Sequence, residues 1–188
     1  MIKIISPHQF KTIPWKNGKG QTTELAISEN DSIDDFNWRL SIASVVEDGA
    51  FSDFSGYERH LILLEGKGIE LNHDKQQIDL LEKRLAVSSF NGASKTIGKL
   101  INGAIKDFNL MTKDEKYQVE VFTSIKQKEI KIDTVDLCFV YTHTAKAVVY
   151  LHTDALKISN GELIVMESEG PIRIVGENLI VVTLGHLY

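Results

Sequence analysis

The stretch Asp48–Gly68, which reads DGAFSDFSGYERHLILLEGKG, contains the features that decide the fold of this chain. Its second half predicts a β-strand, because the aliphatic run Leu61–Leu64 follows Arg59 and His60 and ends at the Gly-rich turn Glu65–Gly68. Successive side chains of a strand point to opposite faces, so Arg59 and His60 do not line the same cavity. The strand therefore offers one cation, Arg59, to one face of a sheet.

Strand signals recur along the chain and outnumber helix signals. Alternating runs rich in β-branched and aromatic residues are found at four places, namely 36–43, 119–122, 147–151 and 162–166. Turn signals such as Asn91-Gly92 separate the strands at intervals of roughly 8–12 residues, which is typical of β-sandwiches and barrels. We therefore predict an all-β fold, with helical turns only near residues 6–10 and 31–36.

A weak internal repeat divides the chain. The first copy runs from a strand at His60–Leu64 through a polar hairpin to a turn at Asn91-Gly92, and the second runs from Cys138–Tyr141 to a turn at Glu169-Gly170-Pro171. Two barrels in tandem, or one barrel with a shortened partner, would account for it. No Pro-, Gly- or Ser-rich linker is visible, so we expect the halves, 1–111 and 112–188, to pack together.

Composition and charge argue against several classes of protein. The 188 residues have a formal net charge of −5 and no Lys/Arg cluster longer than two residues, so we expect no nucleic-acid partner. No apolar run approaches the roughly 18 residues that span a bilayer, and the N-terminus shows no secretory signal, so we expect no membrane partner. The single cysteine, Cys138, lies in an apolar run and is predicted to be a buried packing residue. A cytoplasmic protein is expected.

The segment 14–25, PWKNGKGQTTEL, is the most distinctive stretch. Its glycines and lysine do not have the spacing of a P-loop, which needs four residues between the first Gly and the Gly-Lys pair. One interpretation is a glycine turn that enters a strand, with Trp15 filling the core. The other is a loop at the mouth of a pocket, with Trp15 as an apolar wall and Asn17 as a hydrogen-bonding tip.

The predicted strand at 36–43 has one small, polar face around Arg39. If that face meets solvent, Arg39 is a surface residue; if it lines a barrel, Ser41 and Ala43 leave room beside the guanidinium for a ligand. A buried arginine requires a partner, because an unpaired charge is costly to desolvate. The candidates are Glu24 and the carboxylate of a ligand, which arginine binds in bidentate fashion.

These segments together resemble the HutD/Ves family of bacterial cupin proteins. The resemblance covers about the first 111 residues, and the remainder agrees only in general character. It departs from the family at Lys19, where a third glycine is expected. The motifs concerned are Pro14-Trp15-x-Asn17-Gly18-x-Gly20-x-Thr22-x-Glu24, Phe36-x-Trp38-Arg39-Leu40-Ser41, Asp48-Gly49-x-Phe51-Ser52-x-Phe54-x-Gly56-x-x-Arg59, Leu64-Glu65-Gly66-x-Gly68, Phe90-x-Gly92 and Asp107-Phe108-Asn109-Leu110-Met111.

The resemblance implies a cupin fold, the double-stranded β-helix, with a second, degenerate half: a bicupin-like, jelly-roll protein. In metal-binding cupins the first motif carries a His-x-His pair and a Glu. Counted back from Gly66, those positions fall on Asp53, Ser55 and Arg59, and the histidine position of the second motif falls on Lys95. We therefore expect neither a metal nor another cofactor, and a barrel built for an anion or a carbonyl group.

The resemblance also implies a link to histidine utilisation, through binding of an intermediate such as formylglutamate, and for the Ves branch a link to stress responses. Our leading hypothesis is a cytoplasmic, non-enzymatic binder of a small anionic metabolite. For Asp107 and Asn109 a turn-capping role is favoured over closing the pocket. The carboxylate would be held by Arg39 and Arg59, the apolar walls would be Trp15 and Phe51, and polar contacts would come from Asn17, Glu24 and Ser41.

Two alternatives belong to other classes. A metal-independent isomerase or lyase acting on a small organic acid would use Glu24 as a general base and arginine as the electrostatic stabiliser. An interaction scaffold would have a filled barrel and no ligand. A cavity with Glu24 free of arginine favours the enzyme, a cavity with an ion-paired arginine favours the binder, and the sequence leaves a homodimer open.

Overall fold

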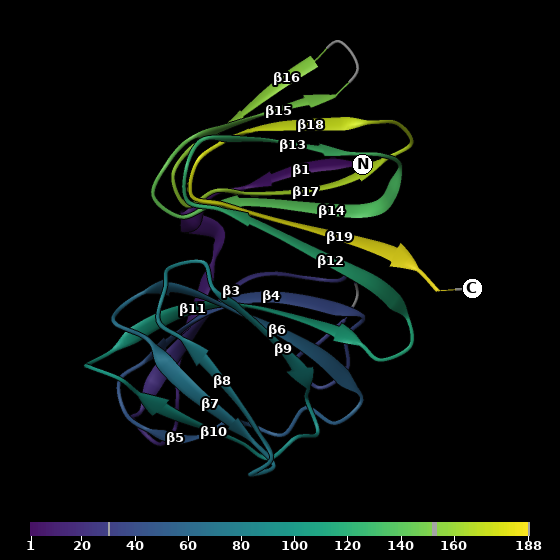
Figure 1. The fold of residues 1–188 in the computed structure, drawn as a ribbon. Coiled ribbons are helices and arrows are strands. Elements are labelled where there is room, and N and C mark those ends of the chain that lie inside the picture. The colour runs from purple at the N-terminus through teal and green to yellow at the C-terminus, as the bar shows by residue number, and fades with distance from the viewer. Residues whose placement is uncertain (30, 152–153, 188) are drawn as a thin grey trace. The chain divides into compact units, whose positions relative to one another are not determined.

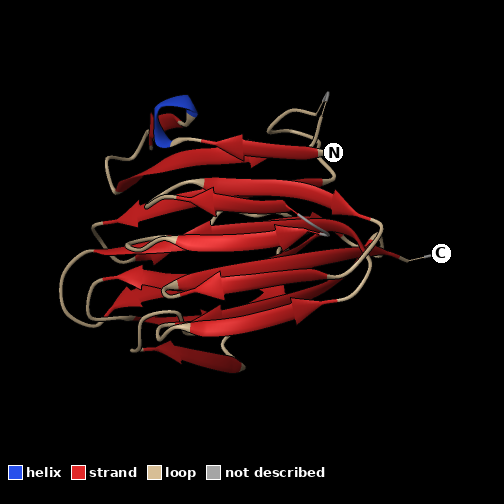
Figure 2. Cartoon of the chain, turned by 90° about the horizontal axis from the view of Figure 1, so that it is seen from above, coloured by secondary structure: helices blue, strands red, loops and turns tan. Residues whose placement is uncertain are grey.

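The computed structural model describes residues 1–29, 31–151 and 154–187, and strands dominate it (Figure 2). The predicted all-β class is confirmed, and the first predicted helical turn corresponds to the short 3₁₀ helix η1 (Pro7–Gln9). The second prediction is wrong, because residues 31–36 are not helical and a β-bridge joins Ser32 to Asp35. No helix among the described residues is long and apolar enough to cross a membrane.

The chain divides into two compact units, Phe10–Lys116 and Met1–Gln9 together with Tyr117–Tyr188. These limits differ from the division expected between residues 111 and 112, which falls within strand β11 (Ile105–Lys113). The N-terminal strand β1 (Ile2–Ile5) also belongs to the second unit, because it pairs with β17 (Leu163–Ser168). Each unit is described separately below.

The unit Phe10–Lys116 consists of two antiparallel sheets (Figure 1). The larger sheet, in the order β2-β3-β4-β11-β6-β9, contains β2 (Lys11–Pro14), β3 (Gly20–Ile27), β4 (Trp38–Val45), β11, β6 (Tyr57–Glu65) and β9 (Val87–Asn91). The smaller sheet, in the order β5-β10-β7-β8, contains β5 (Gly49–Ala50), β10 (Thr96–Leu100), β7 (Ile69–His73) and β8 (Gln77–Leu81).

The second unit repeats this plan. One sheet, in the order β1-β17-β14-β19-β12, contains β1, β17, β14 (Val135–Thr142), β19 (Leu179–His186) and β12 (Tyr117–Ser124). The other, in the order β13-β18-β15-β16, contains β13 (Lys128–Ile132), β18 (Ile172–Gly176), β15 (Ala147–Leu151) and β16 (Asp154–Ile158).

The strand orders establish the internal repeat. Adding eight to each number in β5-β10-β7-β8 gives β13-β18-β15-β16, and the same step converts β4-β11-β6-β9 into β12-β19-β14-β17. Each unit is therefore one double-stranded β-helix. Strands β6 and β14 occupy equivalent positions in the two units, which matches the predicted repeat, since its copies begin at His60 and at Cys138.

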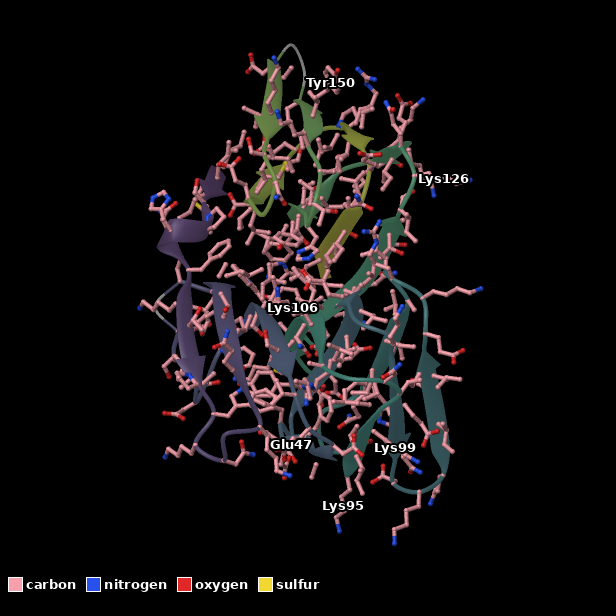
Figure 3. The ribbon with its side chains drawn as sticks, turned by 90° about the vertical axis from the view of Figure 1, so that its left-hand side faces the viewer. Glu47, Lys95, Lys99, Lys106, Lys126 and Tyr150 are labelled. Atoms are coloured by element: carbon pink, nitrogen blue, oxygen red, sulfur yellow. The ribbon has the colours of Figure 1, made fainter. Side chains whose placement is uncertain are left out.

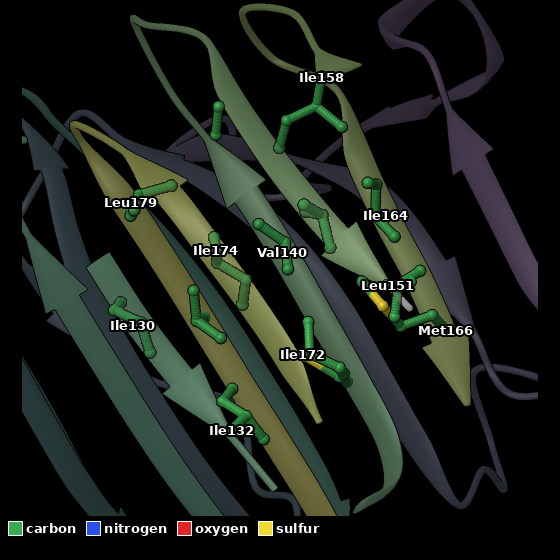
Figure 4. Close-up of a cluster of buried hydrophobic side chains, with 14 residues drawn as sticks. Ile130, Ile132, Val140, Leu151, Ile158, Ile164, Met166, Ile172, Ile174 and Leu179 are labelled. Atoms are coloured by element: carbon green, nitrogen blue, oxygen red, sulfur yellow. The ribbon is translucent and has the colours of Figure 1, made fainter. Parts of the chain in front are cut away.

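The two interiors differ in chemistry. In the second unit the main core cluster is apolar (Figure 4), and the polar residues buried in the described part, Thr142, Ser168 and Thr183, carry no charge. Cys138 is fully buried among aliphatic side chains, so its predicted packing role is confirmed, and burial raises the pKa of its thiol to about 12. In the unit Phe10–Lys116 an apolar cluster, which includes Leu61, Leu71 and Phe90, fills only part of the interior. Buried polar residues lie on the same inward faces, Arg39, Arg59 and Asp107 among them.

Candidate functional site

A cavity of about 700 Å³ lies in the unit Phe10–Lys116. Its floor is the inward face of β4, β11 and β6, and its mouth is formed by residues 13–19 and 47–54. Six of the seven predicted site residues line this cavity, and the seventh, Glu24, does not line it but contacts Arg39. The six that line it are Trp15, Asn17, Arg39, Ser41, Phe51 and Arg59.

The register of three adjacent strands places the two arginines in one row. Met111 of β11 pairs with Arg39 of β4 on one side and with Arg59 of β6 on the other. Neighbouring strands lie about 4.8 Å apart, so the two arginine backbones are separated by about 10 Å. Alternation then directs all three side chains to the cavity, so of the two orientations considered for the face of Arg39 and Ser41, the structure has the one that lines the barrel.

Arg39 is held by Glu24. Its Nε donates a hydrogen bond of 2.8 Å to Glu24 Oε2, and the side chains are 7% and 22% exposed. The pair forms because Glu24 of β3 is opposite Ser41, two residues along β4 from Arg39, on the same inward face. Arg39 therefore has its counterion within the protein.

Arg59 has no such counterion in contact. It is 5% exposed, Nη2 donates to Asn109 Oδ1 at 3.3 Å, and Nη1 donates to the carbonyl of Ser52 at 3.4 Å. Its Nε has no hydrogen-bond partner among the described residues. Burial lowers the pKa of Arg59 to about 10, opposed by the carboxylate of Asp107 and assisted by the charge of Arg39. The guanidinium remains a buried cation at ordinary pH.

Three phenyl rings surround that guanidinium. The carbon Cζ of Arg59 lies 5.3 Å from the ring centroid of Phe51, 5.4 Å from Phe54 and 5.2 Å from Phe90. Aromatic faces attract a cation while excluding water, so they keep Arg59 charged without competing as hydrogen-bond acceptors. Only Phe51 was predicted; the sequence places Phe54 and Phe90 in family motifs but gives no sign that they meet Arg59.

Asp107 and Asn109 lie within β11 and not at a turn, so the favoured turn-capping interpretation is wrong. Asn109 lines the cavity, and its Nδ2 donates to Asp107 Oδ1, while Asp107 is fully buried. The alternation of Asp107, Asn109 and Met111 with Phe108 and Leu110 predicts a strand with one polar face, a signal that was present in the sequence.

The loop 14–20 forms one wall of the mouth. Trp15 Nε1 donates to Thr22 Oγ1 at 2.7 Å, and its ring packs on Gly20, where an added Cβ would lie 2.2 Å from the Ser44 carbonyl oxygen. Lys19, the departure from the family pattern, places its ammonium 3.6 Å from Glu47 Oε2 (Glu47 is labelled in Figure 3). The loop is thus tied to the segment that contains Phe51.

The positions that would hold metal ligands in other cupins do not gather here. Asp53 and Ser55 are exposed and bond each other, since Asp53 Oδ1 accepts from the Ser55 amide. Lys95 is exposed in the β9–β10 turn and points away from the barrel (Figure 3), so the prediction that it replaces a ligand in the pocket is wrong. Among the described residues, no group of three His, Cys, Asp or Glu side chains could hold a metal ion.

Comparison with known proteins relates the chain to one family. A family model described as HutD matches residues 7–181. An uncharacterized 21.2 kDa protein in the hutC 3' region of Pseudomonas putida is 38% identical over 120 residues, which cover 64% of this chain and 63% of that protein. Protein Ves of Escherichia fergusonii is 36% identical over 108 residues, which cover 57% and 56%. The chain thus spans less than two thirds of either relative.

A solved structure of a HutD protein matches over the whole length. It is HutD from Pseudomonas fluorescens SBW25 (formate condition), which is 26% identical to this chain and superposes on it with a TM-score of 0.84. The match covers 100% of each chain. The likeness extends through both β-helical units, including the C-terminal part where sequence motifs were weak. The predicted bicupin-like fold is confirmed.

Proposed function

This chain belongs to the HutD family, and on that premise we propose that it binds a small carboxylate or formylated metabolite, such as formylglutamate, in the cavity of the unit Phe10–Lys116. Arg59 is the principal anion contact. Arg39 and Ser41 supply further polar contacts, and Trp15 and Phe51 form the apolar walls.

The observation that carries the proposal is the electrostatic state of Arg59. A buried charge requires compensation, yet Arg59 has a neutral amide and a backbone carbonyl as its hydrogen-bond partners, both at 3.3 Å or longer, and an unpartnered Nε. A ligand carboxylate supplies what is missing, because it accepts strong, charge-assisted hydrogen bonds from a guanidinium.

The pairing of Glu24 with Arg39 supports a binder over an enzyme. A general base must be able to take up a proton from a substrate, whereas the charge of Glu24 is engaged by Arg39 at 2.8 Å and Glu24 does not line the cavity. The presence of a cavity of about 700 Å³ also argues against the interaction scaffold, which would have a filled barrel. We therefore propose a metal-independent, non-catalytic role.

The physiological role that we propose is control of histidine utilisation in the cytoplasm by sensing an intermediate. Its support is the name of the Pseudomonas putida relative, which places that protein in a hutC region, and the HutD name of the solved relative. A stress response is the alternative, since Ves proteins are also relatives.

A thermal-shift screen with formylglutamate, urocanate, formate and glutamate, combined with metal analysis of the purified protein, tests the proposal. We expect the melting temperature to rise with formylglutamate and no stoichiometric metal. Arg59→Met should abolish the rise. The control is Arg173→Met, since Arg173, like Arg59, lies over an aromatic ring (Tyr150), but it pairs with the carboxylate of Glu129 and lies in the other unit. If none of the four compounds raises the melting temperature at millimolar concentration, the proposed function is contradicted.

A further inference from the structure

Asp107 is the most deeply buried ionisable side chain near the cavity. It is 0% exposed, and its partners across the sheet, Ala43 and Leu63, have apolar side chains that offer its carboxyl group no hydrogen bond. Its Oδ1 accepts from Asn109, whereas Oδ2 has no partner among the described residues. A buried carboxylate with one oxygen unsatisfied is costly, so the un-ionised acid is favoured to a higher pH than in an exposed aspartate.

Asn109 connects this carboxyl group to the anion contact. The same amide accepts from Arg59 Nη2 and donates to Asp107 Oδ1, so a chain of two hydrogen bonds runs from guanidinium to carboxyl. Burial raises the pKa of Asp107 to about 7, although the bond from Asn109 and the charge of Arg59 act in the opposite direction. An ionised Asp107 and a bound anion would therefore compete for one cation.

Other charges on the inward faces of this unit are engaged elsewhere. The core cluster beside β11 supplies apolar side chains from β4, β6 and β7, namely Ala43, Val45, Leu61, Leu63, Ile69 and Leu71. The remaining inward titratable groups are Arg39 and Glu24, which pair with each other, His73, which bonds Thr96, and Asp79, which bonds Ser88. At the edge of the cavity Lys19 pairs with Glu47, and Lys16 is exposed to solvent. Arg59 is thus the cation that responds to the ionisation of Asp107.

We propose that Asp107 determines the charge of the ligand that the cavity accepts, and that binding of a carboxylate draws one proton from solvent onto Asp107. The inference rests on the proposed function of the same cavity. With Asp107 un-ionised, Arg59 is an uncompensated cation and attracts an anion. With Asp107 ionised, the guanidinium is already balanced, and entry of an anion would leave a net negative charge in an apolar enclosure. One carboxylate group and one proton therefore enter together, so that the charge around Arg59, balanced by Asp107 before binding, stays balanced by the ligand after it.

Calorimetric titration of the full chain with formylglutamate and with formate, in phosphate and in Tris at pH 7.5, measures the proton uptake. We expect about 0.5–1 proton per ligand, because a pKa of about 7 leaves most of Asp107 ionised at pH 7.5 before binding, and the bound anion favours its protonation. The apparent Kd should rise about tenfold per pH unit above pH 8, since the protonated fraction falls by that factor. Asp107→Asn should abolish both effects, and Asp79→Asn, a control in the same unit, should preserve them.

Binding without proton uptake in the wild-type chain would overturn this inference and leave the proposed function standing; this result does not depend on whether Asp107→Asn folds. Retention of the pH dependence in a folded Asp107→Asn variant would also overturn it. Failure of both acids to bind at any pH between 5.5 and 8.5 would instead remove the proposed function, and this inference with it.

Discussion

Arg59 of β6 and Asn109 of β11 lie on adjacent strands and share a buried hydrogen bond of 3.3 Å from Nη2 to Oδ1. At that length the bond is weaker than the usual charge-assisted contact of about 2.8 Å. It holds the guanidinium in place without neutralising it. An anion that enters the cavity can therefore gain a full-strength interaction with Arg59 while the protein loses little.

The variant Glu24→Gln distinguishes a non-catalytic binding protein from an enzyme that uses Glu24 as a general base. Glutamine keeps an acceptor for Arg39 but removes a negative charge near the cavity, so we expect affinity for formylglutamate to be unchanged or increased by up to about tenfold. Glu129→Gln, which alters the partner of Arg173 in the other unit, is the control. A loss of binding or of a measured turnover in Glu24→Gln alone would favour the general-base alternative.

The stability of the chain should depend on Asp107 between pH 4 and pH 7. Its pKa is raised from an ordinary value near 3.8 to about 7 by burial, so its contribution is fully present below pH 4 and is lost as pH rises through 7. Relative to the wild type, Asp107→Asn should gain on the order of 3 kcal/mol between pH 4.5 and pH 8 in urea unfolding. A difference that stays constant with pH would show that Asp107 is ionised throughout.

Gly98 controls the position of a cavity wall. A Cβ at this position would lie 2.6 Å from Cε2 of Phe51 and 3.0 Å from Cδ1 of Ile69, so the Phe51 ring must move. We expect Gly98→Ala to weaken formylglutamate binding by about 3- to 10-fold and to cost about 1 kcal/mol in stability. Gly185→Ala is the control, because its added Cβ would meet nothing within 4 Å, and it should change neither the binding nor the stability. Equal affinities of the two variants would argue against Phe51 as a wall of the binding site.

Trp15 should report occupancy of the cavity. Its ring lines the mouth and its Nε1 is bonded to Thr22, so a ligand changes its surroundings directly. Addition of formylglutamate should alter the tryptophan emission of the wild type and of Trp38→Phe, because Trp38 points to the opposite face of β4 from Arg39. A response that survives Trp15→Phe would place the ligand elsewhere.

The local patterns of the sequence predicted the strands and one face of the site. Period-two alternation in 36–43 correctly places Arg39 and Ser41 on one face of a strand, but it left open whether that face meets solvent or lines the barrel. Alternation also separates Arg59 from His60, which bonds Ser89 on the other face of the sheet. Burial lowers the pKa of His60 to about 4, so it is neutral at ordinary pH.

Other parts of the site depend on contacts between distant segments and could not be predicted from local patterns. The three rings around Arg59 come from the β5–β6 segment and from β9, which only the three-dimensional arrangement brings together. Counting positions from Phe90-Asn91-Gly92 led to Lys95, which is exposed, because turn length rather than a fixed interval sets where the next strand begins. The buried position of Asp107 was not predicted, because an acidic residue is rarely fully buried.

Direct calorimetric titration of wild type and Arg59→Met with formylglutamate tests the central claim. Methionine has a similar volume and replaces a buried charge by an apolar group, so the fold should be retained. We predict saturable 1:1 binding to the wild type and to the Arg173→Met control, and a loss of at least about 30-fold in Arg59→Met, since removal of a buried charged partner costs about 2–5 kcal/mol. Undiminished binding to a folded Arg59→Met variant would contradict the assignment of Arg59 as the anion contact.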